Sequence, residues 1–206
     1  MTKLLVVRHG RTGYNATNRI QGQLDTALDE VGRAQALVAA EELARLAPDV
    51  IVSSDLSRAA DTAAALAAQT GLPVRLDPRL RERSFGQWQG LMGTEVAARH
   101  PAQYARWQAG VAIEGCEVEE LDDLAKRAST AFQEAADLAP GGTVAVFCHG
   151  GTAKYGIVAL LGWPSSVLPT VGSMGNCRWA DLRQHPVRGW QLRGYNLGAR
   201  EPGVAR

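Results

Sequence analysis

Residues 4–10 read LLVVRHG, a short apolar run that passes directly into a polar loop. A continuous apolar run of this length predicts a strand buried on both faces of a parallel sheet. The loop brings Arg8 and His9 to the end of that strand. Residues 50–52 (VIV) and 144–147 (VAVF) repeat the arrangement, each with polar residues directly after it. The chain therefore carries three expected buried strands that end in loops able to bind a ligand.

Helical stretches separate these strands. Asp29 is the expected N-cap of a helix that runs to about Leu46, before Pro48. An alanine-rich helix is expected over residues 58–69, closed by Gly71. Further helices are expected over residues 118–138 and 152–161, and further strands over residues 74–76, 176–182 and 189–192. Strands that alternate with helices predict an α/β fold, here a three-layer α/β/α sandwich with a mostly parallel central sheet.

Residues 79–115 break this alternation, because they mix Gly, Pro and Trp with short helical pieces. We expect them to form a lid-like insertion at one face of a single domain, residues 1–206. The residues from Gly198 onward are expected to be frayed.

Composition excludes several classes of partner. The 22 basic and 21 acidic residues nearly balance, so neither nucleic acid nor an anionic membrane is indicated. No apolar run approaches the ~20 residues needed to span a bilayer. Three widely separated cysteines argue against a disulfide framework or a zinc site and favour a reducing compartment. We expect a cytoplasmic protein without metal or cofactor.

The polar loops are expected to meet, because ligands bind beyond the carboxyl ends of the strands in an open α/β sheet. This grouping brings together His9, His149, Arg8 and Arg58, with a helix N-terminus at residues 150–151. Arginine grips phosphate oxygens bidentately, and N-terminal N–H groups of a helix add anion donors. The site is therefore suited to a phosphoryl group, and the pattern alone leaves open whether that group is bound or cleaved.

Four segments carry a family resemblance, in order along nearly the whole chain. They are residues 5–15 (LVVRHGRTGYN), 53–59 (SSDLSRA), 80–90 (LRERSFGQWQG) and 147–151 (FCHGG). They resemble the motifs of the histidine phosphatase superfamily, in the branch that includes phosphoglycerate mutases. The resemblance implies a phosphoglycerate mutase-like fold and a phosphoric monoester hydrolase that acts through a phosphohistidine.

The resemblance also implies roles for individual residues. His9 is the expected nucleophile, and Glu82 the expected general acid and then general base. The phosphoryl group is expected to be held by Arg8, Arg58 and His149, with Asn15 and Gly150 also in the phosphate pocket. A nucleophilic histidine must be neutral at one ring nitrogen, so we expect its other nitrogen to bond a backbone carbonyl.

Two further segments resemble a subgroup, the actinobacterial glucosyl-3-phosphoglycerate phosphatases. They are residues 19–26 (RIQGQLDT) and 172–176 (GSMGN). This likeness implies that Gln21 lines the substrate site, that the substrate is a small phosphorylated metabolite such as glucosyl-3-phosphoglycerate, and that the chain forms a homodimer.

The sequence departs from the family pattern at three places. Arg11 stands where many members have Glu or Gln, and Cys148 where Ser or Ala is more usual. Residues 113–117 (IEGCE) resemble an altered Gly-Gly-Glu-Ser motif, which puts Glu117 in doubt as a substrate contact.

Two other functions share the same motifs. A phosphoglycerate mutase would keep its phosphohistidine from water and return the phosphoryl group to product. A non-catalytic member would only bind a phospho-ligand. The compact insertion favours the phosphatase over the mutase, and intact His9, Glu82 and His149 argue against a silent member.

Overall fold

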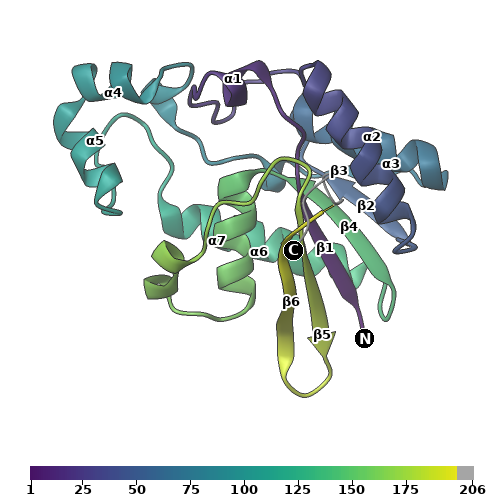
Figure 1. Cartoon of the computed structure of the whole chain (residues 1–206). Helices are drawn as coiled ribbons and strands as arrows, with labels where there is room; N and C mark the ends of the chain where they lie inside the picture. Colours follow the sequence, from purple (N-terminus) through teal and green to yellow (C-terminus); the bar gives the residue numbers. More distant parts are fainter. Residues whose placement is uncertain (199–206) are drawn as a thin grey trace, which may run out of the picture.

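The computed structural model describes residues 1–198 and is built around one six-stranded sheet (Figure 1). The strand order is β3-β2-β4-β1-β5-β6. The pairs β1–β4, β4–β2 and β2–β3 are parallel, while β5 and β6 join antiparallel. The strands are β1 (Lys3–Arg8), β2 (Val50–Ser53), β3 (Val74–Leu76), β4 (Thr143–Cys148), β5 (Trp179–His185) and β6 (Gly189–Leu197). The predicted mostly parallel sheet is confirmed.

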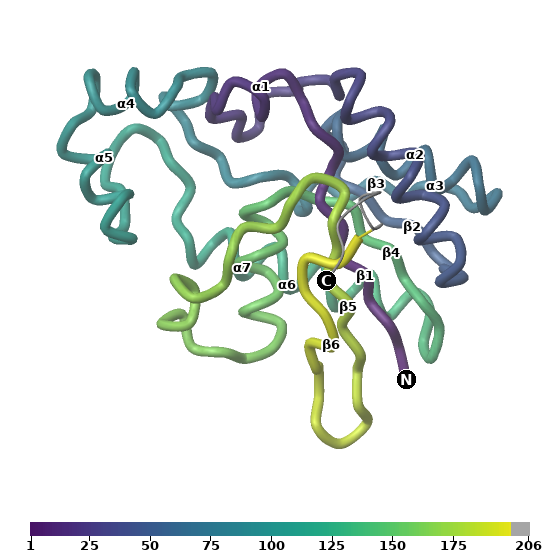
Figure 2. Tube along the Cα trace, viewed as in Figure 1, coloured from purple at the N-terminus to yellow at the C-terminus, as the bar shows by residue number. Residues whose placement is uncertain are grey.

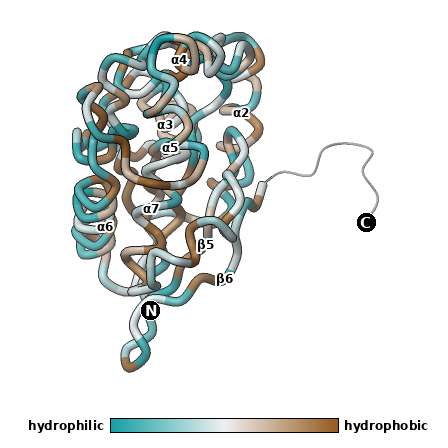
Figure 3. The backbone as a smooth tube through the Cα atoms, turned by 90° about the vertical axis from the view of Figure 1, so that its left-hand side faces the viewer, coloured by the Kyte–Doolittle hydropathy of each residue, from teal (hydrophilic) through white to brown (hydrophobic). Residues whose placement is uncertain are grey.

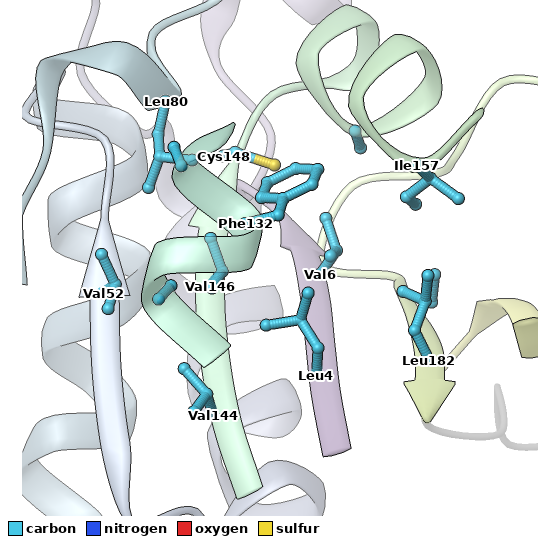
Figure 4. Close-up of a cluster of buried hydrophobic side chains, with 14 of the residues drawn as sticks. Leu4, Val6, Val52, Leu80, Phe132, Val144, Val146, Cys148, Ile157 and Leu182 are labelled. Atoms are coloured by element: carbon cyan, nitrogen blue, oxygen red, sulfur yellow. The ribbon is translucent and has the colours of Figure 1, made fainter. Parts of the chain in front are cut away.

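Helices cover both faces of the sheet, because alternate residues of each buried strand point to opposite sides. Leu5 and Val7 pack with α2 (Glu30–Ala44) and α3 (Ser57–Thr70) on one face. Leu4 and Val6 pack with α6 (Leu121–Asp137) and α7 (Gly150–Leu160) on the other. Figure 4 shows the second cluster, in which the Phe132 ring of α6 lies among the side chains of β1 and β4. The predicted α/β/α layers are therefore present.

The register of the central strands brings their polar ends to one edge. Arg8 is opposite Cys148 in the β1–β4 pair, and Ser53 is opposite Phe147 in the β2–β4 pair. The three following loops therefore leave the sheet side by side. This is the edge at which we expected the ligand site.

Residues 79–115 and the segment around α1 (Gly13–Ala16) lie together beyond that edge, as the trace in Figure 2 shows. The first segment contains η1 (Pro78–Leu80), η2 (Gly86–Trp88), α4 (Gly93–Arg99) and α5 (Pro101–Gln108). It has a small core of its own around buried Trp88, Val96 and Ile113. Ile20 exchanges backbone hydrogen bonds with residues 90 and 91. The lid-like role of the insertion stays a prediction.

Several element boundaries differ from the expected ones. Helix α2 ends at Ala44, before Pro48 is reached, because the chain turns there and Ala47 takes a positive φ of 49°. Helix α6 begins at Leu121 rather than 118, because Cys116 and Glu117 have positive φ and Glu119 N–H bonds to Ser84 O. Helix α7 begins two residues early, at Gly150.

Strand β5 begins at Trp179 rather than 176. The reason is Cys177, whose φ of +54° is incompatible with a strand and whose N–H points to the carbonyls of Arg8 and His9. Strand β6 continues to Leu197, five residues beyond the expected end. The prediction of a frayed end from Gly198 falls almost entirely outside the described residues. Within residues 1–198, no helix is long and apolar enough to cross a membrane.

Candidate active site

His9 lies at the end of β1 and is almost completely buried. Its Nδ1 is 2.7 Å from Gly10 O, so this nitrogen carries the proton and donates it to the carbonyl. The remaining nitrogen, Nε2, is then unprotonated and has a free electron pair. Burial, together with the charges of Arg58 and Arg8, holds the pKa of His9 well below its ordinary value of 6.5. The imidazole is therefore neutral at neutral pH and has the tautomer that a nucleophile requires.

His149 faces His9, with ring centroids 5.1 Å apart. Its Nε2 is 2.9 Å from Ser54 Oγ, which also accepts a hydrogen bond from Leu56 N–H. Burial and the charge of Arg58 lower the pKa of His149 well below 6.5. In a neutral ring that accepts the Ser54 proton at Nε2, Nδ1 carries the hydrogen. Within the described chain that buried Nδ1 has no partner, so it is available as a donor.

Two arginines supply positive charge around the histidines. Arg8 donates from Nη1 to Met174 O at 2.5 Å. Arg58, on α3, is fully buried and donates to Leu24 O at 2.7 Å and Gly22 O at 2.8 Å. Burial lowers the pKa of both, that of Arg58 to about 10, so both stay charged at neutral pH. The Nε atoms of both are buried and lack a partner among residues 1–198.

Glu82 reaches the N-terminus of α7. Its carboxylate accepts hydrogen bonds from Gly151 N–H at 3.0 Å, Thr152 N–H at 3.1 Å and Arg83 N–H at 2.9 Å. Its negative charge is near enough to raise the pKa values of Arg8 and Arg58 against the larger effect of burial. The Glu82 carboxylate is therefore held near the two arginines.

The two glycines at the start of α7 lie close to Arg8 and Glu82, and Gly151 has the tighter surroundings. A Cβ at Gly150 would lie 3.5 Å from Arg8 Nε, and one at Gly151 would lie 2.5 Å from Glu82 Oε1. The sequence predicted these residues as anion donors. In the structure the Gly151 N–H already serves Glu82, so only Gly150 is left facing an arginine of the site.

Asn15, in α1, and Gln21, in the loop that follows it, are the other two side chains that the sequence predicted for the site. Asn15 Oδ1 accepts from Thr12 N–H at 3.1 Å and from Asn176 Nδ2 at 3.4 Å. Gln21 Oε1 accepts from Thr26 Oγ1 at 2.6 Å. Because the amide oxygens are engaged, the free ends of both side chains are NH₂ groups, which are hydrogen-bond donors.

Sequence reasoning did not single out several residues that shape the site. Asn176 donates to His9 O at 3.0 Å, and Ser54 orients His149. Both lie inside motifs that the resemblance had marked, so the signal was present. Glu119 also contacts the segment that carries Glu82, since its Oε2 accepts from Ser84 N–H at 3.0 Å. Glu117, which was in doubt as a substrate contact, is exposed.

Two residues that depart from the family pattern, Arg11 and Cys148, are occupied away from the histidine rings. Arg11 pairs with Asp29 at the start of α2, with a 2.8 Å N–O distance. Cys148 is completely buried in the core, and burial raises the pKa of its thiol, so it is not a reactive thiolate.

A separate cleft of about 1150 Å³ lies between α5, α6, α7 and η3 (Ser165–Thr170). Figure 3 looks onto this side of the molecule, with α5, α6 and α7 toward the reader. Trp107 and Trp163 border the cleft, and none of the predicted site residues does. The chemistry described above therefore lies outside it.

Several known proteins are similar to this chain in sequence and in architecture. The family model for the histidine phosphatase superfamily (branch 1) matches residues 4–198. The glucosyl-3-phosphoglycerate phosphatase of Mycobacterium tuberculosis (strain CDC 1551 / Oshkosh) is 40% identical over 212 residues, covering 96% of this chain and 95% of that protein. The metal-independent phosphoserine phosphatase of Arabidopsis thaliana is 39% identical, over 75% of this chain and 66% of that one. A mycobacterial glucosyl-3-phosphoglycerate phosphatase structure with VO3 is 42% identical and superimposes with a TM-score of 0.86, over 95% of this chain and 99% of that one.

Proposed function

Because this chain belongs to branch 1 of the histidine phosphatase superfamily, we propose that it hydrolyses phosphate monoesters of a small metabolite through a phosphohistidine on His9. One observation carries the proposal: a buried neutral His9 is surrounded by three donor nitrogens that have no partner within residues 1–198. They are Arg8 Nε, Arg58 Nε and His149 Nδ1. A buried donor without a partner costs about 1–3 kcal/mol, and a phosphoryl oxygen would satisfy each.

The first step transfers the phosphoryl group to the protein. The electron pair of His9 Nε2 attacks phosphorus, and the bond from phosphorus to the ester oxygen breaks. Glu82, in its protonated form, gives its proton to that oxygen, so the alcohol leaves neutral. The Gly10 carbonyl, which accepts the Nδ1 hydrogen, is suited to stabilise the positive charge that develops on the imidazole.

The second step returns the enzyme to its starting state. The Glu82 carboxylate takes a proton from a water molecule, and the resulting oxygen attacks phosphorus and displaces His9 Nε2. Inorganic phosphate leaves, and Glu82 is again protonated. Splitting the hydrolysis in this way replaces one difficult displacement by two easier ones.

Charge on the phosphoryl oxygens is neutralised throughout by Arg8 and Arg58. His149 adds a neutral donor through Nδ1, and Asn15 adds another through its NH₂ group. Fixed charges and dipoles aimed at the transferred group account for most of the catalysis in phosphoryl transfer. Gln21 and Gly150 complete the proposed binding site.

The proposed substrate is glucosyl-3-phosphoglycerate. The resemblance of residues 19–26 and 172–176, and the 40–42% identity to enzymes of that name, support it. The test is phosphate release in EDTA from glucosyl-3-phosphoglycerate, phosphoserine, 3-phosphoglycerate and p-nitrophenyl phosphate, with isomerisation of 3-phosphoglycerate followed in parallel.

A clear preference in kcat/KM for the glucosyl ester supports the proposal. Preference for phosphoserine would refute the substrate while keeping the reaction. Isomerisation without phosphate release would make the chain a mutase. The homodimer implied by the subgroup resemblance is tested by light scattering on the same preparation.

A further inference from the structure

The segment that carries Glu82 has no neighbouring strand. Residues 81–85 belong to no helix or strand of the described chain, although η1 precedes them and η2 follows. Backbone pairing therefore does not fix this segment as it fixes the end of β1. A general acid needs to be held within a fraction of an ångström of its working position. Some other part of the molecule must supply that constraint.

Arg127, on α6, donates to two carbonyls of this segment and to one carbonyl of η1, directly before it. Its Nη1 is 2.6 Å from Arg79 O and 2.6 Å from Arg81 O, and its Nη2 is 3.0 Å from Glu82 O. A guanidinium can serve several acceptors at once, because its five N–H groups are arranged in a rigid fork, which a lysine lacks. The side chain thus bonds the backbone on both sides of the acid.

Glu119 completes this arrangement. It accepts from Arg127 Nε at 2.6 Å and from Nη2 at 2.9 Å, so the guanidinium is held in a bidentate pair. The same carboxylate accepts from Ser84 N–H, and Glu119 N–H donates to Ser84 O at 2.9 Å. Both side chains are mostly shielded from solvent, at 20% and 16% exposure. Ion pairs in such surroundings are screened less by water and salt than surface pairs.

Arg81 is also ion-paired with Asp55, but the other side chains that bond the carbonyls of Arg81 and Glu82 are neutral. Gln23 Nε2 donates to Glu82 O at 3.1 Å, and Thr152 Oγ1 donates to Arg81 O at 2.8 Å. Each of these neutral side chains satisfies one carbonyl. Arg127 satisfies three and brings a charge, and hydrogen bonds from a charged donor are about twice as strong as neutral ones.

We infer that Arg127, oriented by Glu119, is a positioning residue that holds the Glu82 carboxyl where it can protonate the leaving oxygen. The inference rests on the proposed role of Glu82. Within the described residues Arg127 is hydrogen-bonded to neither histidine. Its charge is the last and smallest of the contributions that lower the pKa of His149, so its inferred effect is mainly on the placement of the acid.

The test compares two esters with the full-length Arg127→Met variant. An alkyl phosphate needs a proton on its leaving oxygen, whereas p-nitrophenyl phosphate releases a stabilised phenolate. The kcat/KM for the alkyl ester should fall by about 10–100-fold, the effect of a small misplacement. The kcat/KM for p-nitrophenyl phosphate should fall by less than about 3-fold, because acid catalysis contributes little to that ester.

Arg79→Gln is the matched control. Arg79 also ties this segment to α6, through Glu134 at 2.7 Å, but at the exposed surface. It should leave kcat/KM for both esters unchanged. Equal losses for the two esters with Arg127→Met, or no loss for either, would overturn the inference. Arg127→Lys and Glu119→Gln keep a charged or hydrogen-bonding side chain and should show the same selective loss, less strongly, which covers the case of a poorly folding methionine variant.

A double variant separates this inference from the proposed function. If Arg127 acts through Glu82, then Arg127→Met combined with Glu82→Gln should lose no more alkyl-ester activity than Glu82→Gln alone. Additive losses would show that Arg127 acts elsewhere. A Glu82→Gln variant that shows no ester selectivity would instead refute the assignment of Glu82.

Discussion

The proposed nucleophile, His9, and the proposed acid, Glu82, are held by different kinds of structure. His9 ends a strand that is paired on both sides, and its own backbone N–H bonds to Cys148 O. Glu82 lies in an irregular segment whose carbonyls are satisfied by side chains from α6, α7 and the loop after α1. The difference teaches that the sheet fixes the position of His9, while a side-chain network fixes the position of Glu82; under the proposed mechanism these are the places where the phosphoryl group is received and the proton is delivered.

The largest effect is expected for His9→Ala, which removes the proposed nucleophile at the end of β1. Removing the nucleophile should lower kcat by at least about 10⁴-fold, as loss of a nucleophile does in other enzymes that form covalent intermediates. Phosphate release in EDTA measures the loss, and thermal unfolding checks that the fold is intact. Turnover near the wild-type rate would show that His9 is not the nucleophile.

Glu82→Gln tests the proposed general acid. The kcat/KM for an alkyl phosphate should fall by about 10²–10⁴-fold, the usual contribution of general acid catalysis. The value for p-nitrophenyl phosphate should change much less, and a burst of p-nitrophenol should appear because the second step loses its base. The same loss for both esters, without a burst, would remove Glu82 from the mechanism.

Gly151→Ala perturbs the acid without touching its charge. The new Cβ would lie 2.5 Å from Glu82 Oε1, so the flexible carboxylate must move. We expect alkyl-ester kcat/KM to fall by about 10-fold, while stability stays equal or rises by up to about 1 kcal/mol from the gain in helix propensity. Unchanged activity by steady-state kinetics would show that the acid tolerates displacement, and the contrast with His9 would then weaken.

The smallest effect concerns pH and stability. The pKa values of His9 and His149 are both depressed in the folded protein, so the unfolded state binds more protons below the ordinary value of 6.5. The free energy of unfolding should therefore fall as the pH drops through that range. Both histidines contribute to this loss, because each stays neutral in the folded protein while it takes up a proton in the unfolded chain.

Urea unfolding at about pH 7.5 and about pH 5.5 measures this difference. His9→Gln should reduce the pH-dependent loss, since one of the two buried imidazoles is gone. An identical pH dependence in the variant would mean that folding does not lower the pKa of His9, which contradicts the buried neutral imidazole described here.

The sequence predicted the surroundings of His9 better than those of Glu82. The apolar runs predicted three buried strands and the convergence of Arg8, His9, Arg58 and His149, because parallel strands end at a common edge. The tautomer of His9, set by a backbone carbonyl, was also expected and is present. These features depend on local patterns that a sequence displays directly.

The network around Glu82 was not predicted. Arg127 lies in the middle of an amphipathic helix, where an arginine normally faces water, and its partners are backbone carbonyls 45 to 48 residues earlier. Such contacts leave no periodic or local signal. For the same reason the start of α6 was placed too early, and the contacts of Glu119 were not foreseen.

The most direct test of the central claim is to trap the phosphorylated protein. Glu82→Gln is mixed with p-nitrophenyl phosphate, quenched in alkali, and mapped by peptide mass spectrometry. The account predicts one phosphoryl group, on His9, in an amount equal to the burst of p-nitrophenol, and none after His9→Ala is added to the variant. A phosphoryl group on another residue, or a burst without any labelled histidine, would contradict it.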